Sequence, residues 1–443
     1  MASAAEQLAA NLSFSAFRSA SELKKRIWFT LIALLVYRLG TYIPLPGIDA
    51  TALKSVFDQN QSGIIGMFNM FAGGAVGRMA IFALNIMPYI TASIVIQLLT
   101  SVVPHLEQLK KEGEQGRKQI NQYTRYGTVL LATFQGYGIA VGLEGAEGVV
   151  TDPGLFFRLS AVITLVGGTV FLMWLGEQIT ARGVGNGISL IIFAGIVAEL
   201  PSALAGTLEL GRQGALSTFI ILALMIMIVA VIAFIVFMER AQRRLLVQYP
   251  KRQMGNKMMG GDTSHLPLKL NTAGVIPPIF ASSLLLLPIT VANFSGDSAG
   301  GWLTTVTAML GQGQPLYMAM YASGIIFFCF FYTSIVFNPT ETADNLKRQG
   351  GFIPGIRPGA RTAEYIDTIL TRLTTIGAIY LTLVCLLPEF LINAYSVPFY
   401  FGGTSLLIVV NVTMDTVAQV QSHLFAHQYE GLIKKSRLKG GAR

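Results

Sequence analysis

Few residues in this chain have the type and spacing that enzyme chemistry requires. No GxxxxGK[ST] motif occurs, so the sequence lacks the phosphate-binding loop of a nucleotide hydrolase. The glycine-rich run GVGNG at 183–187 resembles a phosphate loop, but it joins two apolar segments instead of following a strand, and we predict a tight turn. His423 and His427 are spaced i, i+4 without the glutamate of a zinc protease, so we interpret them as solvated. We expect a protein that is not an enzyme, with no cofactor and no metal.

Ionisable side chains inside apolar segments would be a second source of chemistry, as proton or ion relays. They are few here: Asp415 lies deepest, toward one end of the last apolar segment, and the others lie near segment ends (Arg38, Glu177, Glu199 and Glu389). An ion-coupled transporter needs a charged or unwound coordination site at the membrane midplane, and no such cluster is present. An ion-coupled secondary transporter of small solutes nevertheless remains the alternative function.

The composition is that of a membrane protein with many spans. Hydrophobic residues make up 52% of the 443-residue chain and charged residues 12%, against ~25% charged in soluble domains. Ten apolar segments are long enough to cross the ~30 Å hydrocarbon core as helices. They are residues 27–43, 79–103, 123–143, 155–175, 186–204, 217–238, 274–293, 316–337, 373–392 and 400–420. The predicted class is an all-α polytopic membrane protein with ten transmembrane helices.

One apolar stretch, from Ile64 to Val103, is too long to be a single span. At ~1.5 Å per residue a continuous helix of this length would be about twice as long as the bilayer core is thick. The stretch is interrupted by Gly73, Gly74, Gly77 and Arg78. We predict a short helix that dips into the membrane before the glycines, then a full crossing from about Met79 to Val103. Backbone broken at membrane depth must be shielded by protein or line a water-filled cavity, so the chain is expected to enclose a cavity.

The basic residues predict the orientation of the chain. With ten spans both termini share a side, and most of the 32 Lys and Arg residues fall on that side, which makes both termini cytoplasmic. Two connections on this side, 239–272 and 338–372, are longer than helical hairpins require. Their charge either sets topology and touches anionic lipid, or binds a soluble partner with an acidic or phosphate surface. Glycines and prolines around the lone Arg357 favour a shaped loop tip and hence the partner.

Eight longer motifs, in order along nearly the whole chain, are together similar to the SecY/Sec61-alpha family. They are IPLPGID at 43–49, MFNMFAGG at 67–74, IMPYI at 86–90, KKEGEQGRKQINQYTRYGT at 110–128, WLGEQITARGVGNGIS at 174–189, HLPLKLNTAGVIP at 265–277, FNPTETADNLKRQGGFIPGIRPG at 337–359 and FYFGGTSLLIVV at 399–410. Each motif is far more specific than a short regular expression. The resemblance implies a protein-conducting channel that translocates unfolded secretory polypeptides across the bacterial inner membrane and releases hydrophobic segments laterally into lipid.

The resemblance also implies a fold of two inverted, pseudo-symmetric five-helix halves around an hourglass pore. The expected divisions are a cytoplasmic N-terminal segment (1–26), an N-terminal half (27–204) with a plug half-helix at about 63–74, an external hinge (205–216), a C-terminal half (217–420) and a basic cytoplasmic tail (421–443). The plug would close the external side of the pore. Its residues would be Ile64, Ile65, Met67, Phe68, Asn69, Phe71, Gly73 and Gly74.

By the same resemblance, a ring of aliphatic side chains would constrict the pore. The ring maps to Ile86, Ile90, Ile188, Ile192, Ile279 and Ile408. The pairs at 86/90 and 188/192 are spaced i, i+4 and share a helix face, a spacing that ordinary packing also produces. An apolar ring binds no particular side chain, dewets when empty and closes around a passing chain.

A lateral gate would open between the second and seventh spans. Its residues would be Thr91, Gln97, Asn271, Ser282 and Leu287. Gln97 and Asn271 are placed so that they could form a hydrogen bond across the gate, although routine helix packing is the alternative reading of these positions. A modest interhelical bond of ~0.6 to 2 kcal/mol would suit a gate that must open for an apolar signal segment.

The two long loops would bind the partner that supplies the energy for translocation. Arg357 matches the family's loop-tip arginine for motor and ribosome docking, and the other expected contacts are Arg243, Arg244, Lys251, Arg252, Lys257, Lys347 and Arg348. The implied partners are SecE-like and SecG-like small membrane subunits, a SecA-like ATPase motor, a translating ribosome, secretory precursors with their signal sequences, and the lipid bilayer. A third possibility, a scaffold or insertase without a pore, would need neither plug nor ring.

Overall fold

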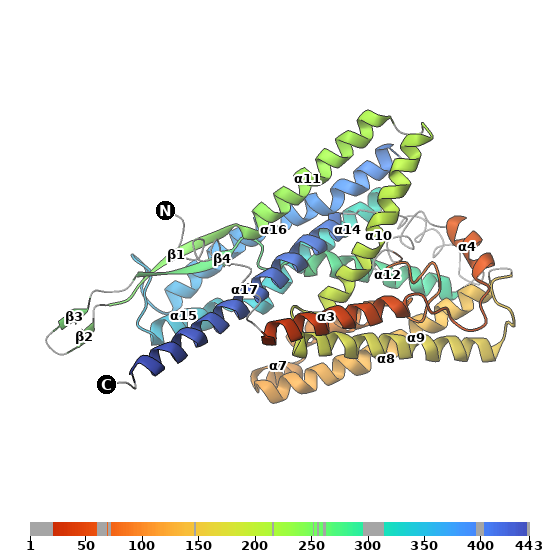
Figure 1. Cartoon of the computed structure of the whole chain (residues 1–443). Coiled ribbons are helices and arrows are strands. Elements are labelled where there is room, and N and C mark those ends of the chain that lie inside the picture. The colour runs from red at the N-terminus through yellow and green to blue at the C-terminus, as the bar shows by residue number, and fades with distance from the viewer. Residues whose placement is uncertain are drawn as a thin grey trace. The chain divides into compact units, whose positions relative to one another are not determined.

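The computed structural model describes residues 21–59, 69, 72–145, 148–214, 217–250, 252–254, 257–259, 263–295, 314–395 and 403–440. Helices account for most of this part of the chain (Figure 1). The chain divides into two compact units, Met1–Pro201 with Val412–Arg443, and Ser202–Asn411. Two helices, α10 (Gly187–Arg212) and α17 (Gly403–Gly440), pass from one unit into the other.

The first unit is built on a long antiparallel helix pair, α8 (Glu114–Glu144) and α9 (Leu155–Arg182). The helices α3 (Ser21–Gly40) and α6 (Met87–Val102) pack beside this pair, and the shorter α4 (Ala50–Gln59) and α7 (Pro104–Lys111) complete the unit with parts of α10 and α17 (Figure 1). Small residues explain how closely α8 and α9 approach each other. Ala132 and Ala140 of α8 and Ala161 of α9 are fully buried, and small side chains let membrane helices pack closely.

The second unit contains five further helices and all the described strands. The helices are α11 (Thr218–Arg240), α12 (Ile276–Ser295), α14 (Pro315–Val336), α15 (Pro339–Arg348) and α16 (Ala360–Tyr395), with α14 packed against both α12 and α16. The strands β1 (Gln242–Gln248) and β4 (Thr263–Lys269) pair antiparallel, as do β2 (Arg252–Met254) and β3 (Lys257–Met259). The loop predicted at 239–272 is thus a β-hairpin, set between α11 and α12.

The predicted membrane segments follow the same order along the chain as the long helices of the structure. Each of the ten segments overlaps one helix among α3, α6, α8, α9, α10, α11, α12, α14, α16 and α17. By length and composition, seven described helices could cross a membrane, or eight if the bent pair α6–α7 counts as one span. The others fall short because α3 is charged at both ends and the described apolar part of α12, Ile276–Leu285, is short.

The predicted crossing from Met79 to Val103 is wrong at its start. Residues 72–86 form turns, and α6 begins only at Met87. Met79 and Asn85 have φ values of 42° and 48°, in the left-handed region that interrupts a right-handed helix. The helix also ends sharply, because the chain bends by 97° between α6 and α7.

Candidate functional site

The predicted plug is described only at its C-terminal end, Asn69 and the turn that runs from Ala72 to Arg78, which we call the plug hinge after its predicted role. Asn69, Gly73 and Gly74 are described, whereas Ile64, Ile65, Met67, Phe68 and Phe71 lie outside the described residues. Gly73 and Gly74 are buried and have φ values of 64° and 79°, which glycine adopts without strain. The Asn69 side chain accepts a hydrogen bond from the amide of Gly77 at 2.7 Å, and its carbonyl accepts one from Gly74 at 2.8 Å. The glycines therefore form a hydrogen-bonded turn, and its role as a hinge stays a prediction.

Two arginines converge on this turn. Arg38 Nη1 and Arg78 Nη2 donate to the same acceptor, the carbonyl oxygen of Gly73, at 2.5 and 2.8 Å. Both guanidinium groups also lie over the ring of Tyr42, at 4.9 and 4.3 Å from its centroid. The carboxylate of Glu199 and the guanidinium of Arg78 lie against Gly74, where a Cβ atom would collide with both. Two of the charged residues near span ends, Arg38 and Glu199, thus lie at the plug hinge together with Arg78, which their sequence separation could not indicate.

The glycine run at 183–187 is a tight turn between α9 and α10, as predicted. Side chains occupy its amides: the hydroxyl of Thr30 accepts from Val184 N at 3.1 Å, and Gln419 Oε1 accepts from Gly185 N at 2.9 Å. Gly187 N donates to the hydroxyl of Thr180 at 2.9 Å. A phosphate cradle needs free amides, and these are already bonded.

The six predicted ring isoleucines are distributed over both units. Ile86, Ile90, Ile188 and Ile192 belong to the first unit, and Ile279 and Ile408 to the second. Ile86 and Ile408 are 1% exposed, Ile192 6% and Ile90 7%, and the remaining two are half-buried. Ile90 N donates to Ile86 O at 3.0 Å, so this pair is one helical turn apart, as its spacing predicted. The ring itself stays a prediction.

The predicted gate residues divide in the same way. Thr91 and Ser282 are buried, and each hydroxyl donates to a carbonyl of its own helix, Met87 O at 3.1 Å and Ile279 O at 2.9 Å. Leu287 lies in α12, but its side chain is not among those that the structure describes. The gate stays a prediction.

The two polar gate residues differ in their hydrogen bonding. Gln97 Oε1 is buried and has no hydrogen-bond partner among the described residues of its own unit. Asn271 Nδ2 donates to Glu239 Oε1 at 2.6 Å and to Gly274 O at 3.1 Å. Both amide hydrogens of Asn271 are therefore occupied within the second unit, and any bond to Gln97 would use Asn271 as the acceptor or compete with these bonds.

The two long loops are joined into one structure, which we call the docking platform after its predicted role; it consists of β1, β4, α15, the loop after α15 and the first turns of α16. Gln248 and Phe352 exchange two backbone hydrogen bonds of 2.9 Å, which links the hairpin to the 338–372 loop. A hydrophobic cluster beneath this link has six buried members, Leu245, Leu268, Ile353, Ile366, Ile369 and Leu373. The platform therefore has a core of its own and holds its surface residues in fixed relative positions.

Basic side chains cover this platform. Arg243, Arg244, Lys347, Arg348 and Arg357 are exposed. Of the other predicted contacts, Lys251 lies outside the described residues, and Arg252 and Lys257 lie on β2 and β3 without a described side chain.

Arg357 lines a hollow of about 560 Å³ at the loop tip. The hollow is also lined by Gly355, Ile356, Arg361, Glu364, Tyr365 and Thr368. Thr362 at the start of α16 donates to the carbonyl of Arg357 at 3.0 Å, which orders the tip. Arg361 and Tyr365 are not among the predicted contacts, and their i, i+4 spacing on α16 is the signal that could have indicated them.

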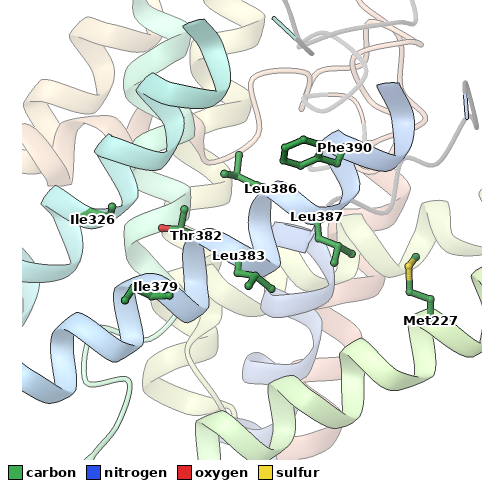
Figure 2. A pocket seen from close by; sticks show the side chains of 8 residues that line it. All are labelled: Met227, Ile326, Ile379, Thr382, Leu383, Leu386, Leu387 and Phe390. Atoms are coloured by element: carbon green, nitrogen blue, oxygen red, sulfur yellow. The ribbon is translucent and has the colours of Figure 1, made fainter. Parts of the chain in front are cut away.

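A second hollow, of about 590 Å³, belongs to the apolar part of the second unit (Figure 2). Its lining comes from α11, α14 and α16 and consists of Met227, Ile326, Ile379, Thr382, Leu383, Leu386, Leu387 and Phe390. Thr382 is the one polar residue in this lining. A solute site needs several polar groups that fix the orientation of the solute, so this hollow does not support the transporter alternative.

An unpredicted ion pair joins α8 to α9. Arg125 Nη2 donates to both carboxylate oxygens of Glu177, at 2.8 and 2.7 Å, and Arg125 Nε adds a bond of 3.1 Å. Fork-shaped pairing of this kind is the strongest geometry for arginine and carboxylate. Among the described residues, no group of three His, Cys, Asp or Glu side chains could hold a metal ion, and Cys329 and Cys385 are buried free thiols.

Comparison with known proteins identifies relatives over almost the full chain. The family model described as SecY matches residues 80–417. "Protein translocase subunit SecY" of Escherichia coli (strain K12) is 59% identical over 426 residues, covering 95% of this chain and 96% of that protein. The Vibrio cholerae protein of the same name is 58% identical over 436 residues, covering 96% of this chain and 98% of that protein.

Solved structures support the fold. The structure described as "The structure of a protein conducting channel" matches with a TM-score of 0.66 at 18% identity, covering 90% of this chain and 92% of that chain. "Sec61 in the Canine ribosome-channel complex from the endoplasmic reticulum" matches with a TM-score of 0.63 at 17% identity, with the same coverage. These likenesses confirm the predicted all-α polytopic class, and this is a multi-pass membrane protein. With a family model that matches most of the residues and curated relatives nearly 60% identical along almost the whole length, the chain belongs to the SecY family.

Proposed function

We propose that this chain is the channel subunit of a bacterial protein translocase and that it is not an enzyme. The single observation that carries the proposal is the near full-length identity of 59% to a protein translocase subunit. Unfolded secretory polypeptides pass through it across the membrane, and hydrophobic segments leave sideways into lipid. The docking platform supports this role, because a conduit without a nucleotide site of its own needs a partner that supplies energy.

The membrane, the partner subunits and the parts of the pore are proposed from the resemblance to the family. The chain resides in the bacterial inner membrane with both termini in the cytoplasm, together with SecE-like and SecG-like small subunits. Two inverted halves, 27–204 and 217–420, enclose the pore, the six isoleucines constrict it, and the segment at about 63–74 closes it from outside. A SecA-like ATPase or a translating ribosome docks on the exposed arginines and lysines of the docking platform.

One crosslinking experiment tests the pore. A photoreactive amino acid replaces Ile408, which is 1% exposed, and a secretory precursor is stalled in transit through the assembled translocase. The matched control carries the same probe at Ile379, which is 60% exposed on α16. We expect adducts with the precursor at position 408 and adducts with lipid at position 379. Precursor adducts that are absent at 408, or equal at both positions, would contradict the conduit.

A charge reversal tests the docking. Arg357→Glu should abolish motor-driven export and leave the amount of folded protein unchanged, because Arg357 is exposed and its side chain lines the open hollow at the loop tip. Arg212→Glu is the matched control, since this arginine is 81% exposed and lies at the end of α10, away from the docking platform. Unchanged export by the Arg357 variant would refute docking at this tip.

A further inference from the structure

The β1–β4 hairpin meets α12 at a short, densely bonded junction. The hairpin ladder continues past β4, because Leu270 N donates to Ala241 O at 3.0 Å. The next residue, Asn271, is 5% exposed, and all its polar side-chain atoms are bonded. Its Nδ2 donates to Glu239 Oε1 at 2.6 Å and to Gly274 O at 3.1 Å, and its Oδ1 accepts from Gly274 N at 3.1 Å. Three elements therefore meet at this amide: α11, the hairpin and the start of α12.

Backbone geometry keeps the junction compact. Gly274 has a φ of 65°, so the turn between Asn271 and α12 depends on a residue without a Cβ atom. Gly377 of α16 packs beneath it, where a Cβ atom would lie 3.0 Å from the carbonyl oxygen of Leu270. Residues 271–275 are not helical, so the Asn271 side chain and its partners hold the chain just before α12 begins. The strongest of these bonds is the one to Glu239, because a carboxylate acceptor strengthens and shortens a hydrogen bond.

From this arrangement we infer that Glu239 is a positioning residue for the gate helix. By accepting from Asn271 it fixes the start of α12 to the last turn of α11 and to the hairpin of the docking platform. Movement of α12 away from its resting position then requires this bond to break or the hairpin to move with it. The inference rests on the proposed function, in which α12 forms one side of the lateral gate. Glu239 would then help to set how hydrophobic a signal segment must be to open the gate.

The size of the effect follows from the strength of one such bond. Hydrogen bonds between membrane helices contribute on average ~0.6 and at most ~1.7 kcal/mol, which is about a threefold to an eighteenfold change in an equilibrium. Loss of the Glu239 bond should therefore raise the export of a precursor with a weakened signal sequence roughly threefold to eighteenfold relative to the same precursor with its intact signal. A residue that only stabilised the fold would lower both exports together.

The experiment compares three variants in inner-membrane vesicles that contain the complete translocase. Glu239→Ala removes the acceptor, Glu239→Gln retains an acceptor oxygen, and Glu112→Ala removes an exposed carboxylate at the end of α7, outside the docking platform, as the matched control. Alanine at 239 should raise the ratio of weak-signal to intact-signal export and accelerate hydrogen exchange at the amide of Gly274. Glutamine should restore most of the normal ratio, and the Glu112 variant should not change it.

Each outcome decides the matter. An unchanged ratio in Glu239→Ala, with intact-signal export at the wild-type level, overturns the inference and leaves the proposed function standing. Glutamine that behaves as alanine also overturns it, since the acceptor is then irrelevant. If Glu239→Ala does not accumulate, Asn271→Asp keeps the bond from Gly274 N and replaces the donor with a second carboxylate, and it should raise the ratio at least as much. Absence of export by the wild-type chain would instead refute the proposed function.

Discussion

The plug hinge provides the sharpest quantitative prediction, because two cations share one acceptor. The perturbation is Arg38→Met, Arg78→Met and the combination of both, since methionine keeps much of the apolar stem and removes the charge. Arg78 loses its bonds to Gly73 O at 2.8 Å and to Thr41 O at 3.3 Å. Arg38 loses its bond to Gly73 O at 2.5 Å. If this network holds the hinge in its resting position, each loss favours displacement of the plug.

The magnitudes should not add. A hydrogen bond from a charged group contributes ~1.5 to 3 kcal/mol, and in either single variant the Gly73 carbonyl keeps one arginine. We therefore expect a cost of about 1.5 kcal/mol for each single change, which is roughly a tenfold larger open fraction. The double variant leaves a buried carbonyl without a donor, at a further penalty of ~1 to 3 kcal/mol. The double change should therefore cost more than the two single changes together, as expected for residues that share a partner.

The assay is the resting ion conductance of the complete translocase reconstituted in planar bilayers, without precursor. Conductance should rise about tenfold in each single variant and more than a hundredfold in the double variant. Lys54→Met, a change of the same kind on α4, is the matched control and should leave the conductance unchanged. Wild-type conductance in the double variant, or strictly additive effects, would refute the shared-acceptor reasoning.

Three further predictions concern α4, the docking platform and one helix contact. The carboxylate of Asp49 accepts hydrogen bonds from the Thr51 hydroxyl and amide, which lowers its pKa below 3.8; Asp49→Ala should speed hydrogen exchange in α4 at pH 7, and the difference should vanish as the pH falls through that lowered pKa. Ile366→Ala in the platform core should cost ~2 to 5 kcal/mol and expose the platform to limited proteolysis, whereas exposed Ile376→Ala should not. Gly403→Ala should reduce the monodisperse fraction after detergent extraction, because its Cβ would collide with a carbonyl of α16, whereas Gly142→Ala meets nothing.

Each of these has a contradicting result. A difference in α4 hydrogen exchange that does not depend on pH would mean that the ionised carboxylate of Asp49 is not the acceptor. Because folding lowers the pKa of Asp49, its stabilising effect should be complete above the ordinary pKa and should be lost as the pH falls through the lowered pKa. Equal proteolysis of both isoleucine variants would show that the docking platform has no core of its own. A normal monodisperse fraction for the Gly403 variant would show that the helices adjust at low cost.

The membrane helices could be predicted from the sequence, because hydrophobic length alone demands them. The lipid core requires about twenty apolar residues for each span, and all ten predicted segments overlap helices. The hairpin was not predictable in the same way. Its strand QRRLLVQ buries Leu245 and Val247: Leu245 packs in one cluster with Leu268 of β4 and with residues more than a hundred positions further along the chain, and Val247 lies beside Gly351. A cluster built from two distant loops leaves no local periodic signal.

The site shows the same division between local and distant information. The turn at 183–187 was predictable because glycines and flanking spans are local features. The convergence of Arg38 and Arg78 on Gly73 was not, since it joins α3 to a turn 35 residues away. Glu239 was overlooked for a related reason: a carboxylate at a helix end looks like an ordinary boundary charge until the amide that it binds is seen.

The start of α6 was mispredicted because apolar residues alone do not reveal which backbone groups have partners. A chain at membrane depth avoids helix only where other groups satisfy its amides and carbonyls. Here the motif after α3 supplies them: Leu45 N donates to Met79 O and Ile81 N to Ile43 O, each at 2.9 Å, and Arg38 covers Gly73 O. The IPLPGID motif and the glycine-rich turns before α6 are therefore parts of one structural feature, joined by these hydrogen bonds. A change that removes either set of partners should extend α6 backward, and the hinge that lets a plug move would be lost with it.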